Sequence, residues 1–197
     1  MSDSSNAITE ALYDKFLLRD VFGKIAPGYL LLFVSISAIF PEFYYKISTH
    51  IDWKYIALLI PVAWLTSLII QSLGERTNYI SLWPSKYNDN KFRYELRNSF
   101  NKIATPQEKQ QASRYELISE SSGIFGATCA LMAIGFLAIG INSLVYKHLY
   151  YQCWRHFLIS GLLVMSSVLL KLHHNLHTLK RYNFYESVNK PNGETYA

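Results

Sequence analysis

Residues 123–146 read GIFGATCALMAIGFLAIGINSLVY, and this stretch decides the fold class. It carries no charged residue and is long enough, at about 1.5 Å per residue, for a helix to cross a bilayer core. Small residues recur along it in two pairs, Gly123-xxx-Ala127 and Gly126-xxx-Ala130, which allow helix backbones to approach closely. We interpret Gly123, Gly126, Ala127 and Ala130 as a packing face, used within the subunit or between subunits of a homo-oligomer.

Three further apolar stretches of similar length lie at 27–45, 53–73 and 154–172. Only 17% of the 197 residues are charged, against about a quarter in an average soluble domain, and 50% are hydrophobic. The sequence therefore predicts an all-α, polytopic membrane protein with four transmembrane helices. Two transmembrane hairpins, 27–73 and 123–172, would be separated and flanked by three polar segments, 1–26, 74–122 and 173–197.

The distribution of basic residues predicts the orientation. Fourteen of the 19 Lys and Arg residues lie in the three polar segments, Lys171 lies at the inner end of the fourth span, and four lie in or beside the two short loops within the hairpins. Under the positive-inside rule, both termini and the central loop are cytoplasmic. We expect the segment 1–26 to be retained and to form a short amphipathic helix at the inner surface, because Ile8, Leu12 and Phe16 recur at helical spacing.

Two long helices are expected to continue beyond the membrane. Thr105-Pro106-Gln107-Glu108 combines a Thr N-cap, Pro at the first helical position and Glu at the third, which together predict a helix start. No proline interrupts the pattern from Pro106 to the end of the third span, and the fourth span continues until Pro191. The two extensions, one in the cytoplasmic loop before the third span and one in the tail after the fourth, would be helical and would pack side by side as a stalk.

A basic amphipathic helix is predicted between Tyr87 and Ala104, because its apolar residues share one helical face and its basic residues lie elsewhere. The apolar face would meet lipid, the stalk or a partner. Anionic headgroups explain the basic residues more simply than nucleic acid, so no direct nucleic-acid contact is expected. The predicted contacts with a cytoplasmic partner protein are Phe92, Arg93, Arg97 and Phe100, with Arg181 and Tyr185 of the tail.

His173, His174 and His177 form the one cluster with metal-ligand spacing, because His173 and His177 share a helix face. Three histidines are too few for a di-iron site without carboxylates, and no His-Glu motif links the cluster to Glu75, Glu116 or Glu120. We favour a polar helix end with no metal and no cofactor. Nucleophile motifs, phosphate-binding glycine loops and charged residues deep in the spans are also missing, which argues against an enzyme and against ion-coupled transport.

Two stretches, Asp20-Val-Phe-Gly-Lys-Ile-Ala-Pro-Gly28 before the first span and Ile70-Gln-Ser-Leu-Gly-Glu75 at the end of the second, carry a resemblance. With the size, topology and large second loop, they resemble small four-span membrane proteins encoded beside bacterial anti-phage defence genes, in particular the membrane-subunit family of the Kiwa system. The resemblance implies a homotetramer in the bacterial inner membrane that detects infection at the envelope and tethers a cytoplasmic, DNA-binding effector. It assigns no functional residue.

These observations favour a non-enzymatic, multi-pass sensor and scaffold whose partners are the lipid bilayer, further copies of itself and a soluble cytoplasmic effector. The alternative is a pore-forming or membrane-depolarising effector, in which the small-residue face closes a ring. A metal-dependent membrane enzyme ranks third.

Overall fold

The computed structural model describes residues 18–39, 53–81, 84, 89–146 and 150–190. Within these ranges nearly every residue is helical and none is in a strand, which confirms the all-α class. The elements are a π-helix, η1 (Leu18–Ile25), and five α-helices: α2 (Ala26–Ile39), α4 (Trp53–Arg76), α5 (Asn90–Ile103), α6 (Pro106–Tyr146) and α7 (Tyr150–Asn189). Of the short helix predicted between Ile8 and Gly23, residues 8–17 lie outside the described residues, and residues 18–23 belong to η1.

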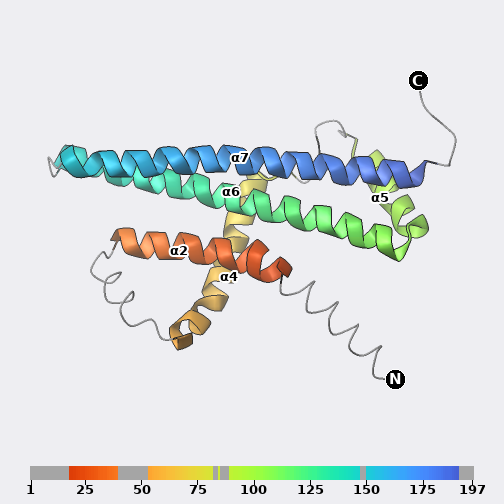
Figure 1. The fold of residues 1–197 in the computed structure, drawn as a ribbon, viewed down its shortest axis with the longest axis horizontal. Helices are drawn as coiled ribbons and strands as arrows, with labels where there is room; N and C mark the ends of the chain where they lie inside the picture. Colours follow the sequence, from red (N-terminus) through yellow and green to blue (C-terminus); the bar gives the residue numbers. More distant parts are fainter. Residues whose placement is uncertain (1–17, 40–52, 82–83, 85–88, 147–149, 191–197) are drawn as a thin grey trace.

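Helices α6 and α7 form a long antiparallel hairpin, and they lie side by side along their whole length (Figure 1). They have 41 and 40 residues, so each extends about 60 Å at the ordinary helical rise. The prediction of two helices that run without a break from apolar into polar sequence is confirmed. We call residues 123–172 the apolar half of the hairpin, and residues 106–122 with 173–189 the stalk.

The start of α6 is a reciprocal capping box, as the sequence predicts. The Glu108 carboxylate accepts a hydrogen bond from the Thr105 backbone N–H at 2.7 Å, and the Thr105 hydroxyl accepts one from the Glu108 N–H at 3.3 Å. The backbone and hydroxyl donors of Thr105 stabilise the carboxylate and lower the pKa of Glu108. The cap therefore fixes the turn by which α5 leads into α6.

Two helices are long and apolar enough to cross a membrane, and they are the ones within residues 106–145 and 153–189. A shorter apolar helical stretch covers residues 23–35. The prediction of membrane-spanning helices is thus supported for α6 and α7, whereas four spans and the direction of the termini stay predictions. Large apolar side chains project from both helices in this half, and Met165 and Leu169 are each 63% exposed.

The N-terminal helices pack on one side of the hairpin. Helices η1, α2 and α4 all contact α6, and in Figure 1 α2 runs along the hairpin whereas α4 crosses it at a steep angle. The backbones of α2 and α4 meet where Gly28 lies against Ala63, so closely that a Cβ atom at Gly28 would be 1.8 Å from the Ala63 carbonyl oxygen. A contact without side chains in between allows the two axes to cross steeply rather than align.

We predict that Gly28→Ala lowers the stability of the fold by about 1–3 kcal/mol, because the methyl group collides with backbone that cannot turn aside. Gly161→Ala is the matched control, since nothing lies within 4 Å of a Cβ atom there. Thermal unfolding of the purified protein in mild detergent measures both. Equal melting temperatures for the two variants would contradict the crossing of α2 and α4 at Gly28.

Candidate functional site

The stalk is held together by polar side chains that reach from one helix to the other. As these contacts move back along α6 from residue 122 to residue 116, they move forward along α7 from residue 173 to residue 181, so they form a ladder between two antiparallel helices. The pairs, in order away from the apolar half, are Ser122 with His173, Ser119 with His174 and Thr178, and Glu116 with Arg181. These polar contacts therefore help to align the two helices of the stalk.

The predicted histidine cluster belongs to this ladder. His173 Nδ1 lies 2.9 Å from the Ser122 hydroxyl, and His174 Nδ1 lies 2.7 Å from the Ser119 carbonyl oxygen. The ring of His177 lies 4.4 Å from that of His173, centre to centre, and near the Tyr115 ring. Burial lowers the pKa of His177, and His173 and Lys180 lower it further, so this ring is neutral at pH 7.

This geometry bears on metal binding. Among the residues that the structure describes, no three His, Cys, Asp or Glu side chains gather in an arrangement that could hold a metal ion. The carboxylate of Glu116 lies 3.3 Å from the Arg181 guanidinium, and Glu75 accepts a hydrogen bond from Gln71. Two of the three carboxylates that the sequence offered as extra ligands therefore have other partners.

An aromatic cluster joins α5 to the far end of the stalk. Phe100 of α5 is 2% exposed, and its ring packs against Tyr185 at 4.5 Å and against Phe184 at 5.9 Å, centre to centre. The Asn189 side-chain amide donates to the Leu96 carbonyl oxygen at 3.0 Å, which ties α5 to the end of α7. The predicted amphipathic helix therefore has its apolar face on the stalk.

The predicted partner contacts divide into two groups. Phe92 is 45% exposed and Arg97 is also exposed, whereas Arg93 is half-buried. Phe100, Arg181 and Tyr185 are buried inside the α5–stalk cluster. Only the first group therefore presents a surface to another molecule.

Arg181 sits at the centre of this cluster. Its guanidinium pairs with Glu116 and lies 5.3 Å from the centre of the Tyr182 ring, a cation–π distance. Burial raises the pKa of both Tyr182 and Tyr185, although the Arg181 charge opposes the rise. Both phenols are therefore neutral hydroxyls at physiological pH, and the cluster holds one compensated ion pair.

The predicted small-residue face is occupied within the chain. Gly123 makes room for His174 and Ile80, and Gly126 makes room for Tyr79 and Leu170. Ala127 is buried in the same region, and Ala130 is half-buried. Of the two uses that the sequence left open, the structure shows packing within the subunit at these positions.

Sequence reasoning missed what fills that face, namely residues 79–81, which we call the strap. Helix α4 ends at Arg76, and two residues later Asn78 lies in the left-handed region at φ 55°. The N–H groups of Asn78 and Tyr79 return to the carbonyls of Glu75 and Gly74. This turn directs the strap onto the hairpin, where the Tyr79 hydroxyl donates to the Ser167 carbonyl oxygen at 2.6 Å. The one available signal was Asn78, a residue type that tolerates the left-handed conformation after an apolar helix.

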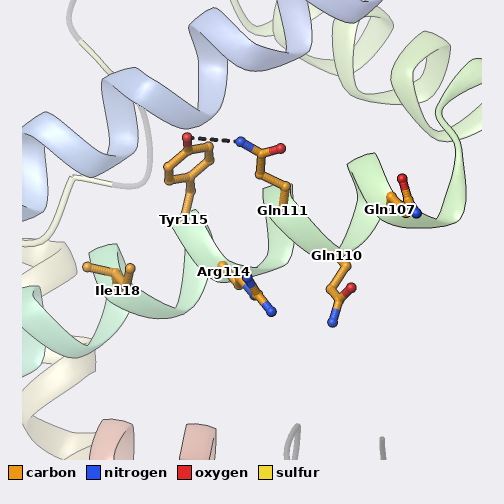
Figure 2. A pocket seen from close by; sticks show the side chains of 6 residues that line it. All are labelled: Gln107, Gln110, Gln111, Arg114, Tyr115 and Ile118. Carbon is orange, nitrogen blue, oxygen red and sulfur yellow. Dashed lines mark hydrogen bonds between the residues drawn. The ribbon is translucent and has the colours of Figure 1, made fainter.

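A groove of about 370 Å³ lies along α6 in the stalk (Figure 2). All of its lining residues come from α6, and the Gln111 amide donates to the Tyr115 hydroxyl at 3.3 Å across one turn. The lining residues are Gln107, Gln110, Gln111, Arg114, Tyr115 and Ile118. Because a single helix forms it, the groove is part of the stalk surface.

Comparison of the chain with protein-family profiles, with curated proteins and with solved structures finds no match.

We predict that Phe100→Ala destabilises the docking of α5 by about 3–5 kcal/mol, as expected for an aromatic side chain removed from a buried cluster. Phe92→Ala, on the exposed side of the same helix, should change stability by less than about 0.5 kcal/mol. Amide hydrogen exchange across residues 90–103 measures both changes. Similar loss of protection in the two variants would show that α5 is not anchored through Phe100.

Proposed function

We propose that this chain is a non-enzymatic membrane scaffold that holds a soluble effector protein at the cytoplasmic face of the bacterial inner membrane. The main support for the proposal is that the α6–α7 hairpin consists of an apolar half and a polar stalk, with α5 packed at the far end of the stalk (Figure 1). Lipid is the natural environment of the apolar half, because monomeric soluble proteins rarely expose so much contiguous apolar surface.

The distance between α5 and the apolar half favours a soluble protein, and not lipid headgroups, as the binding partner of α5. Phe100 packs on Tyr185, which lies thirteen residues beyond Leu172, or about 20 Å at helical rise. The headgroup layer on each side of a bilayer is only about 5–8 Å thick. With the stalk upright, α5 stands beyond that layer, and its exposed cations face water.

The proposed docking face consists of three side chains that the stalk leaves exposed around α5, namely Phe92, Tyr94 and Arg97. Aromatic and arginine side chains are the types that contribute most to protein interfaces. Phe100 anchors α5 on the stalk through its contact with Tyr185. The docking face therefore lies on a rigid support, which reduces the entropic cost of binding.

The wider predictions are part of the same proposal. Four spans with both termini inside the cell account for the distribution of Lys and Arg. Self-association, as a tetramer or otherwise, would use exposed apolar surface of α6 and α7, since Gly123 and Gly126 already contact residues of the same chain. A role in anti-phage defence is what the resemblance to Kiwa-type membrane subunits implies.

The proposed topology predicts which positions are accessible from each side of the membrane. In intact cells, a membrane-impermeant maleimide should label His148→Cys, between α6 and α7, but not Ser113→Cys on the exposed stalk. Permeabilisation should expose Ser113→Cys to the reagent. The native Cys129 and Cys153 are buried and give little background. Labelling of Ser113→Cys in intact cells would overturn the cytoplasmic placement of α5.

The proposed docking face predicts the behaviour of a second pair of variants. The protein is expressed with its neighbouring genes and extracted in mild detergent, and a soluble protein should be retained in a fixed ratio. Phe92→Ala/Arg97→Ala should lose that protein while remaining in the membrane, and Asn101→Ala, also exposed on α5, should retain it. If the wild-type chain emerges alone as a closed oligomer, the scaffold proposal fails, and ion flux in liposomes tests the alternative.

A further inference from the structure

The buried imidazole of His174 lies between two carbonyl oxygens. His174 is 2% exposed, its Nδ1 lies 2.7 Å from the Ser119 carbonyl oxygen, and its Nε2 lies 2.8 Å from the Ser81 carbonyl oxygen. A carbonyl oxygen can only accept a hydrogen bond, and a neutral imidazole carries a single N–H. Only the imidazolium form, with an N–H at each nitrogen, satisfies both carbonyls together.

The neighbouring hydroxyls complete this pattern. Thr178 donates its hydroxyl proton to the His174 carbonyl oxygen at 2.9 Å and therefore accepts from the Ser119 hydroxyl. The single proton of the Ser119 hydroxyl is then shared between Thr178 and, at 3.3 Å, the His174 carbonyl oxygen, so this hydroxyl presents a lone pair to His174 Nδ1, 3.0 Å away. Both oxygens of Ser119 near Nδ1 thus act as acceptors, which again favours a proton on that nitrogen.

His174 is also the polar link between the strap and the stalk. The Ser81 carbonyl oxygen bonds to His174, while Ile80 is buried between Gly74 and Gly123. The strap joins the end of α4 to the segment that leads into α5. Whatever holds Ser81 on His174 therefore restrains the connection between the N-terminal helices and α5.

We propose that the strap is an acid-stabilised latch, which doubly protonated His174 holds on the α6–α7 hairpin and which loosens when His174 loses its second proton. The deprotonated ring must abandon one carbonyl, and the strap is the side that can move because Ser119 lies within a continuous helix. This inference stands on the hydrogen bonds around His174 and does not depend on the proposed docking function.

Other charged and titratable groups lie on the elements that pack around His174. They are Glu116 and Glu120 on α6, Tyr79 in the strap, Glu75 and Arg76 at the end of α4, and Lys171, His173 and His177 on α7. The cation of Lys171 lies over the Tyr79 ring at 4.9 Å, and the Glu116 carboxylate is paired with Arg181.

Amide hydrogen exchange of the full-length protein in detergent tests the latch, because the N–H groups of Tyr79 and Ile80 both bond to the Gly74 carbonyl oxygen and report strap position. Their protection factors, corrected for intrinsic rates, are measured from about pH 5 to about pH 9, across the range in which histidines titrate. We expect a fall of about tenfold to a hundredfold as pH rises, the effect of losing one hydrogen bond to a charged group. Constant protection over this range would overturn the latch.

Two variants separate His174 from its neighbours. In His174→Gln, whose side chain cannot become cationic, strap protection should be low and independent of pH, while protection in α6 and α7 shows that the hairpin is folded. His173→Gln, at an exposed position on the same helix, should keep the wild-type pH profile. A pH profile that follows His173 instead of His174 would refute the assignment.

A direct measurement on the wild-type chain does not depend on any variant folding. Nitrogen-15 spectra of histidine distinguish an imidazolium, with two N–H groups, from either neutral tautomer. His174 should show two protonated nitrogens under the conditions in which the strap is protected. A single neutral tautomer with the strap still protected would refute the latch.

Discussion

The register in which α6 pairs with α7 is the constraint on which the rest of the structure depends. In the apolar half it is marked by the Ser160 hydroxyl, which donates to the Ala133 carbonyl oxygen at 2.9 Å. In the stalk it is marked by the polar ladder that ends with Glu116 and Arg181. The position of α5 depends on this pairing, because α5 packs on a cluster formed by Ala112 of α6 with Tyr182 and Tyr185 of α7. A slip of one turn would separate all of these partners.

The two halves of the hairpin obtain their stability in different ways. In the proposed bilayer, lipid tails would be as apolar as the helices, so association in the apolar half would depend on close backbone approach and on hydrogen bonds such as the one that Ser160 donates. The stalk lies among polar groups, and there the buried aromatic rings of α5 and α7 supply a hydrophobic contribution. The small residues near Gly123 lie at the junction, where they admit side chains from the strap and from His174.

Local signals allowed much of the fold to be predicted. The capping residues at Thr105 and Glu108, the lengths of the two long helices and the amphipathic α5 follow from periodicity and cap chemistry, which act within a few residues of sequence. The side of α5 that faces the stalk could not be predicted from the same local signals. Periodicity shows that Phe92 and Phe100 share a helical face, but the end of α7 covers only Phe100. The sequence pattern therefore predicted α5 correctly, but it placed Phe100, Arg181 and Tyr185, which are buried between α5 and the stalk, among the partner contacts. The strap escaped prediction because its position depends on residues about ninety positions away.

The ladder also restricts how the length of the stalk can vary among related chains. An insertion in α6 alone would rotate and displace every later residue relative to α7, since a helix turns by about 100° and rises about 1.5 Å with each residue. Only paired insertions preserve the facing partners, and about seven residues in each helix, close to two whole turns, return the same side of both helices to the seam. The distance from the apolar half to α5 is therefore adjustable only in steps of about 10 Å. The stalk could therefore lengthen or shorten only by whole multiples of this step.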